Sequence, residues 1–325
     1  MSKNVLVTGA NAGLGFDVAR QLALSGRWSS VTLTARSAEK AARAIQQLVE
    51  LTGLKVFSTV VFDNNKPDTI LDAVAKLAER DQKLDAVILN AGGMGRVGDD
   101  GLPLRTDLGL TEMFAMNVGG HALLVQELIN ARLLTAGATV VFAGSEAARG
   151  IKKMGVPVPT LPDGLGDLDT TLSAVVRGAH ARKDYNPQVD YGLVKLIGAA
   201  WMKDLSERHD LRALTVSPGF TAGTEGLNKA PIPLPMKLMF KYVMLPFMRL
   251  TGNAHNLEVG AARFVQALED DDLKAGLFYA SAPKHISGPL VQQTGALQPL
   301  LDDTAFYAAA GRLIDREVAA QAAAA

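Results

Sequence analysis

The feature that most constrains this chain is its beginning, NVLVTGANAGLGFDVARQLALSG, which covers residues 4–26. Residues 4–8 form an apolar run typical of a buried strand, and apolar residues then recur at helical spacing up to Gly26, which predicts a helix end. Three glycines separate the two patterns, namely Gly9, Gly13 and Gly15. A single glycine there would indicate a tight turn that needs positive φ. Three of them favour a dinucleotide site, because bare backbone lets a pyrophosphate reach the N–H groups at the helix start.

Composition narrows the classes of function. The chain has 325 residues, enough for one or two domains, and its acidic and basic residues balance at 33 each, so no net field attracts nucleic acid or an anionic membrane. It contains no cysteine and its five histidines lack ligand spacing, so we expect neither disulfides, nor a cysteine nucleophile, nor a metal site. The first strand is expected to begin at residue 4, which leaves no room for a signal peptide. No apolar run reaches the about 18 residues of a membrane span. We therefore expect a cytoplasmic protein without an integral membrane segment.

Strands alternate with helices along the first half of the chain. Further strands are expected at 30–35, 55–62, 85–90 and 138–145, with helices over 38–53, from Pro67 onward, and over 109–133. This rhythm predicts a Rossmann-type α/β fold, a doubly wound parallel sheet with helices on both faces. Later elements are helices at 188–209 and 256–270, a strand at 211–217 and a strand at 276–281 that closes the sheet. We expect one domain over 1–325, with a loop-like insertion at 146–187, a substrate lid at 221–255, and an extension at 281–325 that ends in a frayed AAQAAAA tail.

The ends of the strands are where a ligand should bind in such a sheet. Arg36 and Ser37 follow the second strand, where an arginine accommodates a 2′-phosphate, so we expect NADP(H). The alternative for Arg36 is a surface residue near a helix start. Asp63, followed by Asn64, either accepts from the adenine amino group or caps the next helix. The expected cofactor-binding residues of this half are Gly9, Asn11, Ala12, Gly13, Leu14, Gly15, Arg36, Ser37, Asp63, Asn64, Asn90, Ala91 and Gly92.

A candidate acid/base group comes from Tyr191 and Lys195, which share a helix face at i, i+4 spacing. A free tyrosine has a pKa near ~10, and a nearby ammonium lowers the pKa, so we expect an activated phenol. Such a group exchanges a proton with a substrate oxygen while hydride moves to or from the carbon. Ser145, at the end of the fifth strand, would hold the same oxygen. The Tyr-x-x-x-Lys spacing alone is common on helix surfaces, but the glycine loop and the strand-end serine favour an active site.

Six motifs occur together in a characteristic order along the chain. They are TGANAGLG (8–15), NAG (90–92), MNVGG around Asn117, Ser145, YGLVK (191–195) and SPGFT (217–221). Over about residues 1–280 the chain resembles the short-chain dehydrogenase/reductase family. The resemblance implies Tyr191 as acid/base, Lys195 as its pKa modifier and ribose ligand, and Ser145 as the group that orients the substrate oxygen. It implies that Asn117 holds a water-linked proton path.

The same resemblance extends to the cofactor and the insertion. It implies that Pro218, Gly219 and Thr221 line the nicotinamide side, and LTARS is similar to NADP-dependent carbonyl reductases. The insertion before Tyr191 is similar to that of monomeric carbonyl reductases, retinol dehydrogenases and light-dependent protochlorophyllide reductases. Residues 161–169 and 287–303 most resemble the last group, whose pigment-site cysteine has no counterpart here. Because the insertion would obstruct the usual tetramer contact, we expect a monomer or dimer.

The segment 231–250, PIPLPMKLMFKYVMLPFMRL, bears on the substrate. It follows the SPGFT strand end and holds four of the chain's ten methionines, which suit a surface that closes on a bulky apolar molecule. The alternatives are ordinary core packing and a peripheral membrane contact through its basic residues. The leading hypothesis is thus an NADP(H)-dependent carbonyl reductase or alcohol dehydrogenase for bulky apolar substrates. The alternatives are a protochlorophyllide-reductase-like C=C reductase, or a non-catalytic NADP(H)-binding sensor or scaffold.

Overall fold

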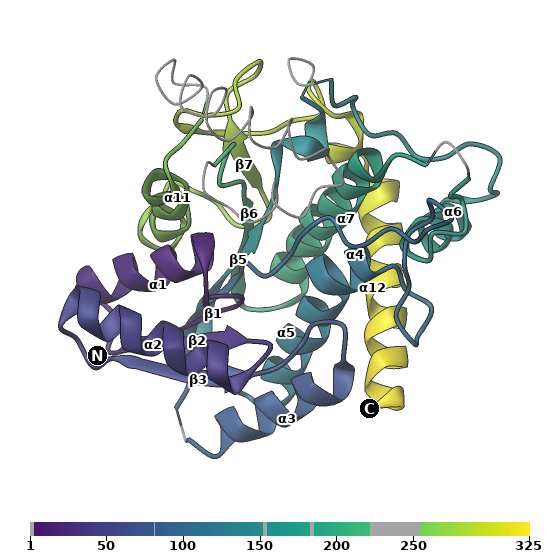
Figure 1. Ribbon diagram of the computed structural model, residues 1–325. Coiled ribbons are helices and arrows are strands. Elements are labelled where there is room, and N and C mark those ends of the chain that lie inside the picture. The colour runs from purple at the N-terminus through teal and green to yellow at the C-terminus, as the bar shows by residue number, and fades with distance from the viewer. Residues whose placement is uncertain (1–2, 81, 152–154, 183–184, 222–253) are drawn as a thin grey trace.

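A single eight-stranded sheet organises the computed structural model, which describes residues 3–80, 82–151, 155–182, 185–221 and 254–325 (Figure 1). Its strands are β1 Asn4–Val7, β2 Ser30–Ala35, β3 Phe57–Val61, β4 Leu84–Leu89, β5 Leu134–Ala143, β6 Leu211–Val216, β7 Phe278–Ser281 and β8 Leu290–Gln292. The strand order is β3-β2-β1-β4-β5-β6-β7-β8, with parallel pairing throughout except between β7 and β8. The order reverses between β1 and β4, which is where a doubly wound sheet opens its ligand crevice. The predicted fold class is confirmed.

Helices cover both faces of this sheet (Figure 1). They are α1 Gly13–Leu24, α2 Ala38–Thr52, α3 Pro67–Ala78, α4 Glu112–Phe114, the π-helix η1 Ala115–Gly119, α5 Gly120–Asn130, the 3-10 helix η2 Glu146–Arg149, α6 Leu168–Val176, α7 Pro187–Arg208, α11 Leu257–Glu269, the 3-10 helix η5 Pro299–Leu301 and α12 Thr304–Ala324. Val5 and Val7 of β1 pack into one core with α1, α2 and α11, whereas Leu6 packs into the other with α3, α5, α7 and α12. Successive residues of a strand face opposite sides, so a sheet covered on both faces requires apolar strands throughout.

The structure corrects the expected elements around the catalytic half of the chain. The helix expected over 109–133 is interrupted by the π-helix η1 and ends at Asn130, and β5 begins already at Leu134. The segment 146–187 is not a plain loop, since it contains η2 and α6. Asp167 caps α6 by accepting from the Thr170 N–H at 2.8 Å, a start signal that is readable in the sequence.

The C-terminal part also differs from expectation. The sheet is not closed by residues 276–281, because β8 adds an antiparallel edge strand beside β7. The alanine-rich tail is not frayed but forms α12 up to Ala324. Phe306, Leu313 and Ile314 of this helix are buried in the core that also holds α7, and such packing stabilises a helix beyond its local propensity. Within the described part of the chain, none of the helices combines the length and the apolarity needed to cross a bilayer.

Candidate active site

The glycine loop lies between β1 and α1, and two of its glycines adopt positive φ. Gly9 has φ +63° and Gly13 has φ +59°, and a Cβ on Gly9 would lie 3.0 Å from the Cα of Ala91. Gly15 serves close packing instead, because a Cβ there would lie 2.5 Å from the Asn90 Nδ2 atom. The N-cap of α1 is Ala12, whose side chain offers no capping acceptor, so the first N–H groups of the helix can receive an anion. Turn geometry and close approach thus both account for the three glycines, and the loop fits a pyrophosphate.

Arg36 and Ser37 follow β2 directly, as expected. Arg36 is exposed and makes no hydrogen bond or ion pair with the other described residues. Ser37 caps α2, its hydroxyl accepting from the Lys40 N–H at 3.4 Å. Among the described residues the guanidinium of Arg36 therefore has no partner at the strand end, while the Ser37 hydroxyl bonds with the backbone of α2.

Asp63 and Asn64, which follow β3, make different contacts. The N-cap of α3 is Lys66, so the alternative that Asp63 caps this helix is wrong; its carboxylate accepts from the Asn65 N–H at 3.0 Å. The Asn64 side chain points into the protein and donates to the Met116 carbonyl at 2.8 Å. As a cofactor ligand Asn64 could therefore act through its backbone alone.

The ends of β1 and β4 are bound together through Thr8. The Asn90 amide donates to the Thr8 carbonyl at 2.9 Å, and the Ala91 N–H donates to the Thr8 hydroxyl at 2.9 Å. Gly92 is packed against Asn117, since a Cβ on Gly92 would lie 2.4 Å from the Asn117 Oδ1 atom. A residue without a side chain is therefore required at Gly92, where the loop after β4 passes the π-helix η1.

The π-helix η1 that carries Asn117 is held by side-chain donors from neighbouring turns and from distant parts of the chain. Four carbonyls of this region accept from side chains: Met113 from Asn117 (2.7 Å), Met116 from Asn64 (2.8 Å), Asn117 from His121 (3.0 Å) and Gly119 from Gln321 (3.3 Å). A wide helical turn lacks part of the regular ladder, so these donors satisfy its backbone. The Asn117 amide also donates to the Gly93 carbonyl at 2.6 Å, which ties the helix to the loop after β4.

His121 is a buried member of this site that the sequence did not single out. Burial lowers the pKa of His121 to about 3, so the imidazole is neutral. Its Nδ1 faces the Asn117 carbonyl, which can only accept, so Nδ1 carries the proton and Nε2 accepts from the Thr8 hydroxyl at 3.0 Å. The feature of the sequence that could have identified His121 is its i, i+4 spacing from Asn117, which places both side chains on one helix face.

Ser145, Tyr191 and Lys195 meet at the carboxyl end of β5. Tyr191 and Lys195 lie one turn apart on α7, which Asn186 caps and Pro187 begins. Ser145 lies two residues after β5, and its hydroxyl is near enough to the Tyr191 hydroxyl to lower the pKa of Tyr191. The Lys195 ammonium is 5.5 Å from the Tyr191 ring centroid and donates to the Ala143 carbonyl at 2.7 Å. The fold thus brings together the three groups that the sequence placed far apart.

The pKa values of this group differ from expectation. Burial raises the pKa of Tyr191 to about 12, with the Ser145 hydrogen bond opposing the rise and the Glu146 charge adding to it. Burial also lowers the pKa of Lys195 to about 7, so this side chain is only partly charged at neutral pH. The expectation that the tyrosine pKa is lowered is therefore wrong for the chain by itself, because desolvation raises this pKa and Lys195 is not among the groups that shift it.

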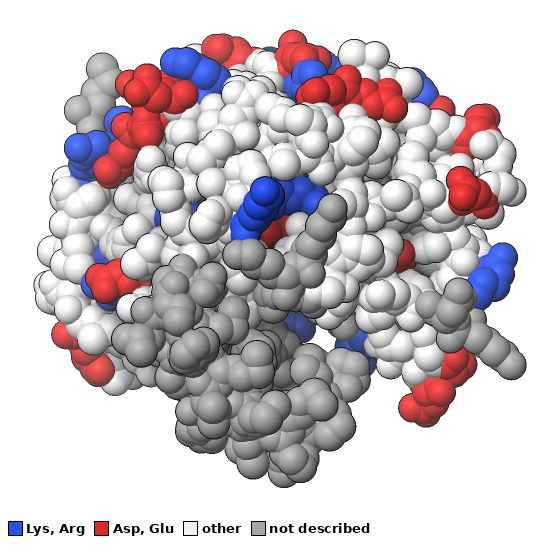
Figure 2. Space-filling view, turned by 90° about the horizontal axis from the view of Figure 1, so that it is seen from above, with Lys and Arg blue, Asp and Glu red and all other residues white. Residues whose placement is uncertain are grey.

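Pro218, Gly219 and Thr221 form a tight turn after β6. The Pro218 carbonyl accepts from the Thr221 hydroxyl at 3.1 Å and from the His255 Nδ1–H at 3.1 Å, and Gly219 has φ +75°. Residues 222–253 lie outside the described residues, so the predicted segment 231–250 and most of the lid at 221–255 are not described. On the face seen from above, many charged side chains lie toward the rim, one group of basic and acidic side chains lies near the centre, and uncharged residues fill much of the described area between them (Figure 2).

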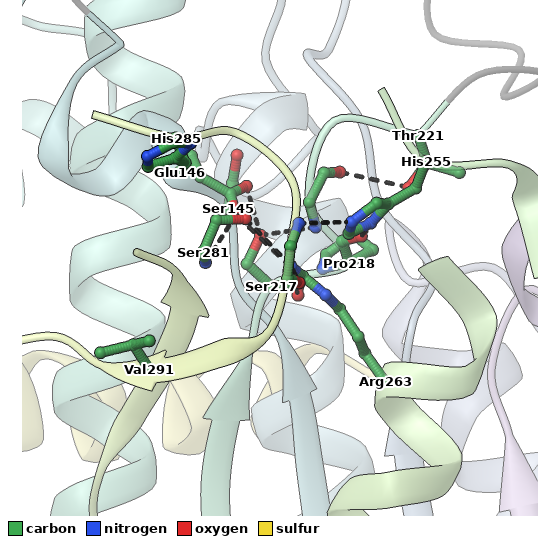
Figure 3. Close-up of polar contacts among 12 residues, drawn as sticks. Ser145, Glu146, Ser217, Pro218, Thr221, His255, Arg263, Ser281, His285 and Val291 are labelled. Carbon is green, nitrogen blue, oxygen red and sulfur yellow. Dashed lines mark hydrogen bonds and ion pairs between the residues drawn. The ribbon is translucent and has the colours of Figure 1, made fainter. Parts of the chain in front are cut away.

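Two buried charged residues next to this turn also escaped the sequence reasoning, Glu146 and Arg263 (Figure 3). Glu146 follows Ser145 directly, and Arg263 lies on the buried side of α11 beside Phe264. A charge on an otherwise apolar helix face was the signal that could have identified Arg263. Among the described residues, no group of three or more His, Cys, Asp or Glu side chains could hold a metal ion.

Comparisons with known proteins agree with this arrangement. A family profile described as short chain dehydrogenase matches residues 3–157. The chain is 38% identical over 120 residues to Short-chain dehydrogenase anuI of Penicillium roqueforti, which covers 37% of this chain and 46% of that protein. It is 26% identical over 296 residues to protochlorophyllide reductase B of Hordeum vulgare, which covers 85% of this chain and 70% of that protein. The chain spans about half the length of the Penicillium protein and of a WW domain-containing oxidoreductase from Gallus gallus.

Solved structures show the same fold. The NADPH bound carbonyl reductase from chicken fatty liver superposes with a TM-score of 0.56 at 19% identity, covering 85% of this chain and 91% of that one. An actinorhodin polyketide ketoreductase with NADPH also gives a TM-score of 0.56, at 19% identity over 82% of this chain and 90% of that one. Residues 3–157 are thus similar in sequence to the short-chain dehydrogenase family, and the chain shares the fold of these two reductases.

Proposed function

We propose that this protein is an NADP(H)-dependent oxidoreductase that transfers hydride between nicotinamide and a carbonyl or alcohol carbon of a bulky apolar substrate. The observation that carries the proposal is that Ser145 and Tyr191 come close at the carboxyl end of β5, with Lys195 one turn further along α7. Two hydroxyls that share one region of space can both bind a single substrate oxygen. All three side chains are present, which disfavours a non-catalytic sensor or scaffold.

The residues present fit a 2′-phosphorylated dinucleotide. Gly9, Gly13 and the uncapped start of α1 suit a pyrophosphate, and the free Arg36 guanidinium suits a second phosphate. NADPH is bound in the chicken carbonyl reductase that shares this fold, and we extend that cofactor to this chain as a proposal. When bound, NADP(H) supplies or accepts the hydride.

The chain's own residues would handle the proton. Burial keeps Tyr191 protonated at neutral pH, since its pKa is about 12, so its hydroxyl is ready to donate a proton to a carbonyl oxygen. The Ser145 hydroxyl donates a hydrogen bond to the same oxygen and stabilises the charge that develops there. A protonated Tyr191 is the form that carbonyl reduction requires. The proposed water-linked path at Asn117 would have to run beside a carbonyl that already accepts from His121.

The test is a panel of aldehydes, ketones and alcohols followed by NADPH and NADH absorbance, with Tyr191→Phe as the decisive variant. Tyr191→Phe removes one hydroxyl, so it should abolish turnover while NADPH binding, measured by fluorescence titration, stays within a few-fold of wild type. A Tyr191→Phe enzyme that keeps most of its activity would rule out the acid/base role.

The preference for bulky apolar substrates rests on the surface around the site. Met94 and Val97, in the loop after β4, are each 38% exposed, and uncharged residues fill much of the face above the strands (Figure 2). We propose that the segment 231–250 closes over this surface as a substrate lid. The test compares kcat/KM for 9,10-phenanthrenequinone with that for butanone, in wild type and in Met239→Ser/Met244→Ser. A higher kcat/KM for butanone, left unchanged by the double substitution, would show that this segment is not a substrate lid.

A C=C reductase is the second candidate, because the barley protochlorophyllide reductase aligns over 85% of this chain. The chain contains no cysteine to match the pigment-site cysteine of that group, which favours carbonyl chemistry. Product analysis decides between them: an α,β-unsaturated ketone yields an allylic alcohol in carbonyl reduction and a saturated ketone in C=C reduction.

We also propose that the protein acts in the cytoplasm.

A further inference from the structure

Beneath the candidate active site, one buried carboxylate is bound by two strand ends at once (Figure 3). Glu146, the residue after Ser145, is 3% exposed. Its Oε2 accepts from the Ser217 hydroxyl at 2.5 Å, and its Oε1 accepts from the Ser281 hydroxyl at 2.9 Å and from the Ser281 N–H at 3.2 Å. Ser217 follows β6 and Ser281 ends β7, so Glu146 joins the carboxyl ends of β5, β6 and β7.

Arg263 binds the same two serines from α11. It is 4% exposed, its Nη1 donates to the Ser217 carbonyl at 2.9 Å, and its Nη2 donates to the Ser281 hydroxyl at 3.0 Å. Nη1 also lies 3.6 Å from Glu146 Oε1, and Nη2 donates to the Gly288 carbonyl. The two opposite charges therefore compensate each other where water does not reach.

This cluster reaches the turn that would line the nicotinamide. The Ser217 hydroxyl, which donates to Glu146, accepts from the Gly219 N–H at 3.1 Å. His255 donates to the Pro218 carbonyl and accepts from the Gly288 N–H at 2.8 Å, and burial lowers its pKa, so it is a neutral link. The turn packs closely against this cluster at Gly219. A Cβ added there would lie 2.8 Å from His255 Nδ1 and 2.9 Å from Arg263 Nη1.

We infer that Glu146 and Arg263 are positioning residues that fix the Pro218–Gly219 turn relative to Ser145. The inference rests on the proposed function, in which Ser145 binds the substrate oxygen and the turn lines the nicotinamide. Apolar packing is non-directional, whereas this carboxylate and guanidinium set both the distance and the direction between the strand ends. A hydride donor and its acceptor must be aligned closely, and a small displacement lowers the rate of transfer strongly.

The test uses Glu146→Gln, which keeps the shape of the side chain and removes its charge. Three quantities are measured well below the unfolding temperature: kcat for 9,10-phenanthrenequinone with NADPH and its 4-deuterated form, the NADPH dissociation constant, and the fluorescence lifetime of bound NADPH. We expect kcat to fall about 10- to 100-fold, as for a misplaced reacting group, with a larger isotope effect and an altered lifetime. The dissociation constant should change by less than about threefold, since the phosphate-binding residues are untouched.

Two further variants separate positioning from stability. In Glu146→Gln/Arg263→Gln the buried Arg263 charge is removed together with its partner, and only Arg149 still loses the attraction of Glu146, so the unfolding temperature should recover in part while kcat stays low. The matched control is Glu317→Gln on α12, because Glu317 is equally buried and bonds with Arg177 at 2.8 Å. It should lower the unfolding temperature without changing kcat or the lifetime.

The inference is overturned if kcat and the lifetime of Glu146→Gln equal those of wild type, if the double variant regains kcat together with stability, or if Glu317→Gln lowers kcat equally. If Glu146→Gln does not fold, Arg263→Lys is measured in its place. Lysine keeps the positive charge but lacks the paired N–H donors of the guanidinium. A wild type that binds NADPH but reduces no carbonyl compound contradicts the proposed function, and the lifetime then still tests the positioning role.

Discussion

At the scale of single residues, burial decides the chemistry of this site more than the identity of neighbouring charges does. Tyr191 and Lys195 carry the spacing of an activated phenol, yet burial moves the tyrosine pKa up to about 12 and the lysine pKa down to about 7. His121 is likewise kept neutral by burial. Tyr191 and His121 are thus held as uncharged donors and acceptors, and Lys195 is only partly charged at neutral pH.

Arg36 offers the sharpest residue-scale test of the cofactor. Arg36→Ala should weaken NADPH binding by about 10- to 100-fold, the equivalent of about 1.5 to 3 kcal/mol for a hydrogen bond to a charged group. NADH lacks the 2′-phosphate, so its dissociation constant should stay the same. Both constants are measured by fluorescence titration, with Arg43→Ala on α2 as control, because Arg43 is an exposed arginine bound to Glu39. Equal affinity of wild type for the two cofactors would show that Arg36 binds no phosphate.

His180 links residue chemistry to pH. Burial lowers the pKa of His180, but the Asp190 carboxylate, 2.9 Å from Nε2, raises the pKa more, so the net pKa lies above the ordinary value. A pKa that is higher in the folded state adds stability below the unfolded pKa, and this contribution is lost as pH rises through the folded pKa. His180→Gln should therefore cost about 1.5 to 3 kcal/mol at pH 5.5 and less at pH 9. Thermal unfolding at both pH values measures it, with the exposed His285→Gln as control. A cost independent of pH would show that the pair is not charged.

At the scale of elements, the helix that carries Asn117 is shaped by what packs against it. The π-helix η1 sits between α4 and α5, and Gly120 at the start of α5 lies against Asn64 at the end of β3. A Cβ on Gly120 would lie 2.3 Å from the Asn64 carbonyl oxygen. The wide turn and this close approach together place Asn117 beside the loop after β4.

Gly120→Ala tests this coupling between packing and the site. Alanine favours a helix locally, but here its methyl group must push η1 away from β3, at a cost of about 1 to 3 kcal/mol for overpacking. We expect a lower unfolding temperature and a lower kcat, because Asn117 moves with the helix. Differential scanning calorimetry and turnover with NADPH measure the two effects. An alanine variant as stable as wild type would show that the contact is readily relieved.

At the scale of the whole molecule, α12 returns the chain end across the helical face that α5 and α7 present (Figure 1). Phe306 is 1% exposed in the core that holds α7. Glu317 of α12 bonds with Arg177 after α6, and Gln321 bonds with Gly119 in η1. The C-terminal helix thus ties the insertion before Tyr191 and the π-helix to one core.

We propose that this arrangement keeps the protein monomeric or at most dimeric. Light scattering coupled to size-exclusion chromatography should give one or two copies, and a tetramer would contradict the proposal.

Phe306→Ala should destabilise the fold by about 3 to 5 kcal/mol, the range for a buried phenylalanine, because α12 then packs less well against α7. Ala308→Ser, on the exposed side of the same helix, should change the stability little.

The sequence by itself determined the features that depend on local rules. The order of strands and helices, the glycine turn after β1 and the shared face of Tyr191 and Lys195 follow from periodicity, turn chemistry and helical spacing, which a few neighbouring residues specify. The tertiary structure alone decided what depends on distant partners. Donors from Asn64 and Gln321 reach the carbonyls of the π-helix, and α7 buries the apolar side of α12. The tyrosine pKa went the opposite way to expectation because desolvation depends on the whole surrounding shell rather than on spacing along the chain.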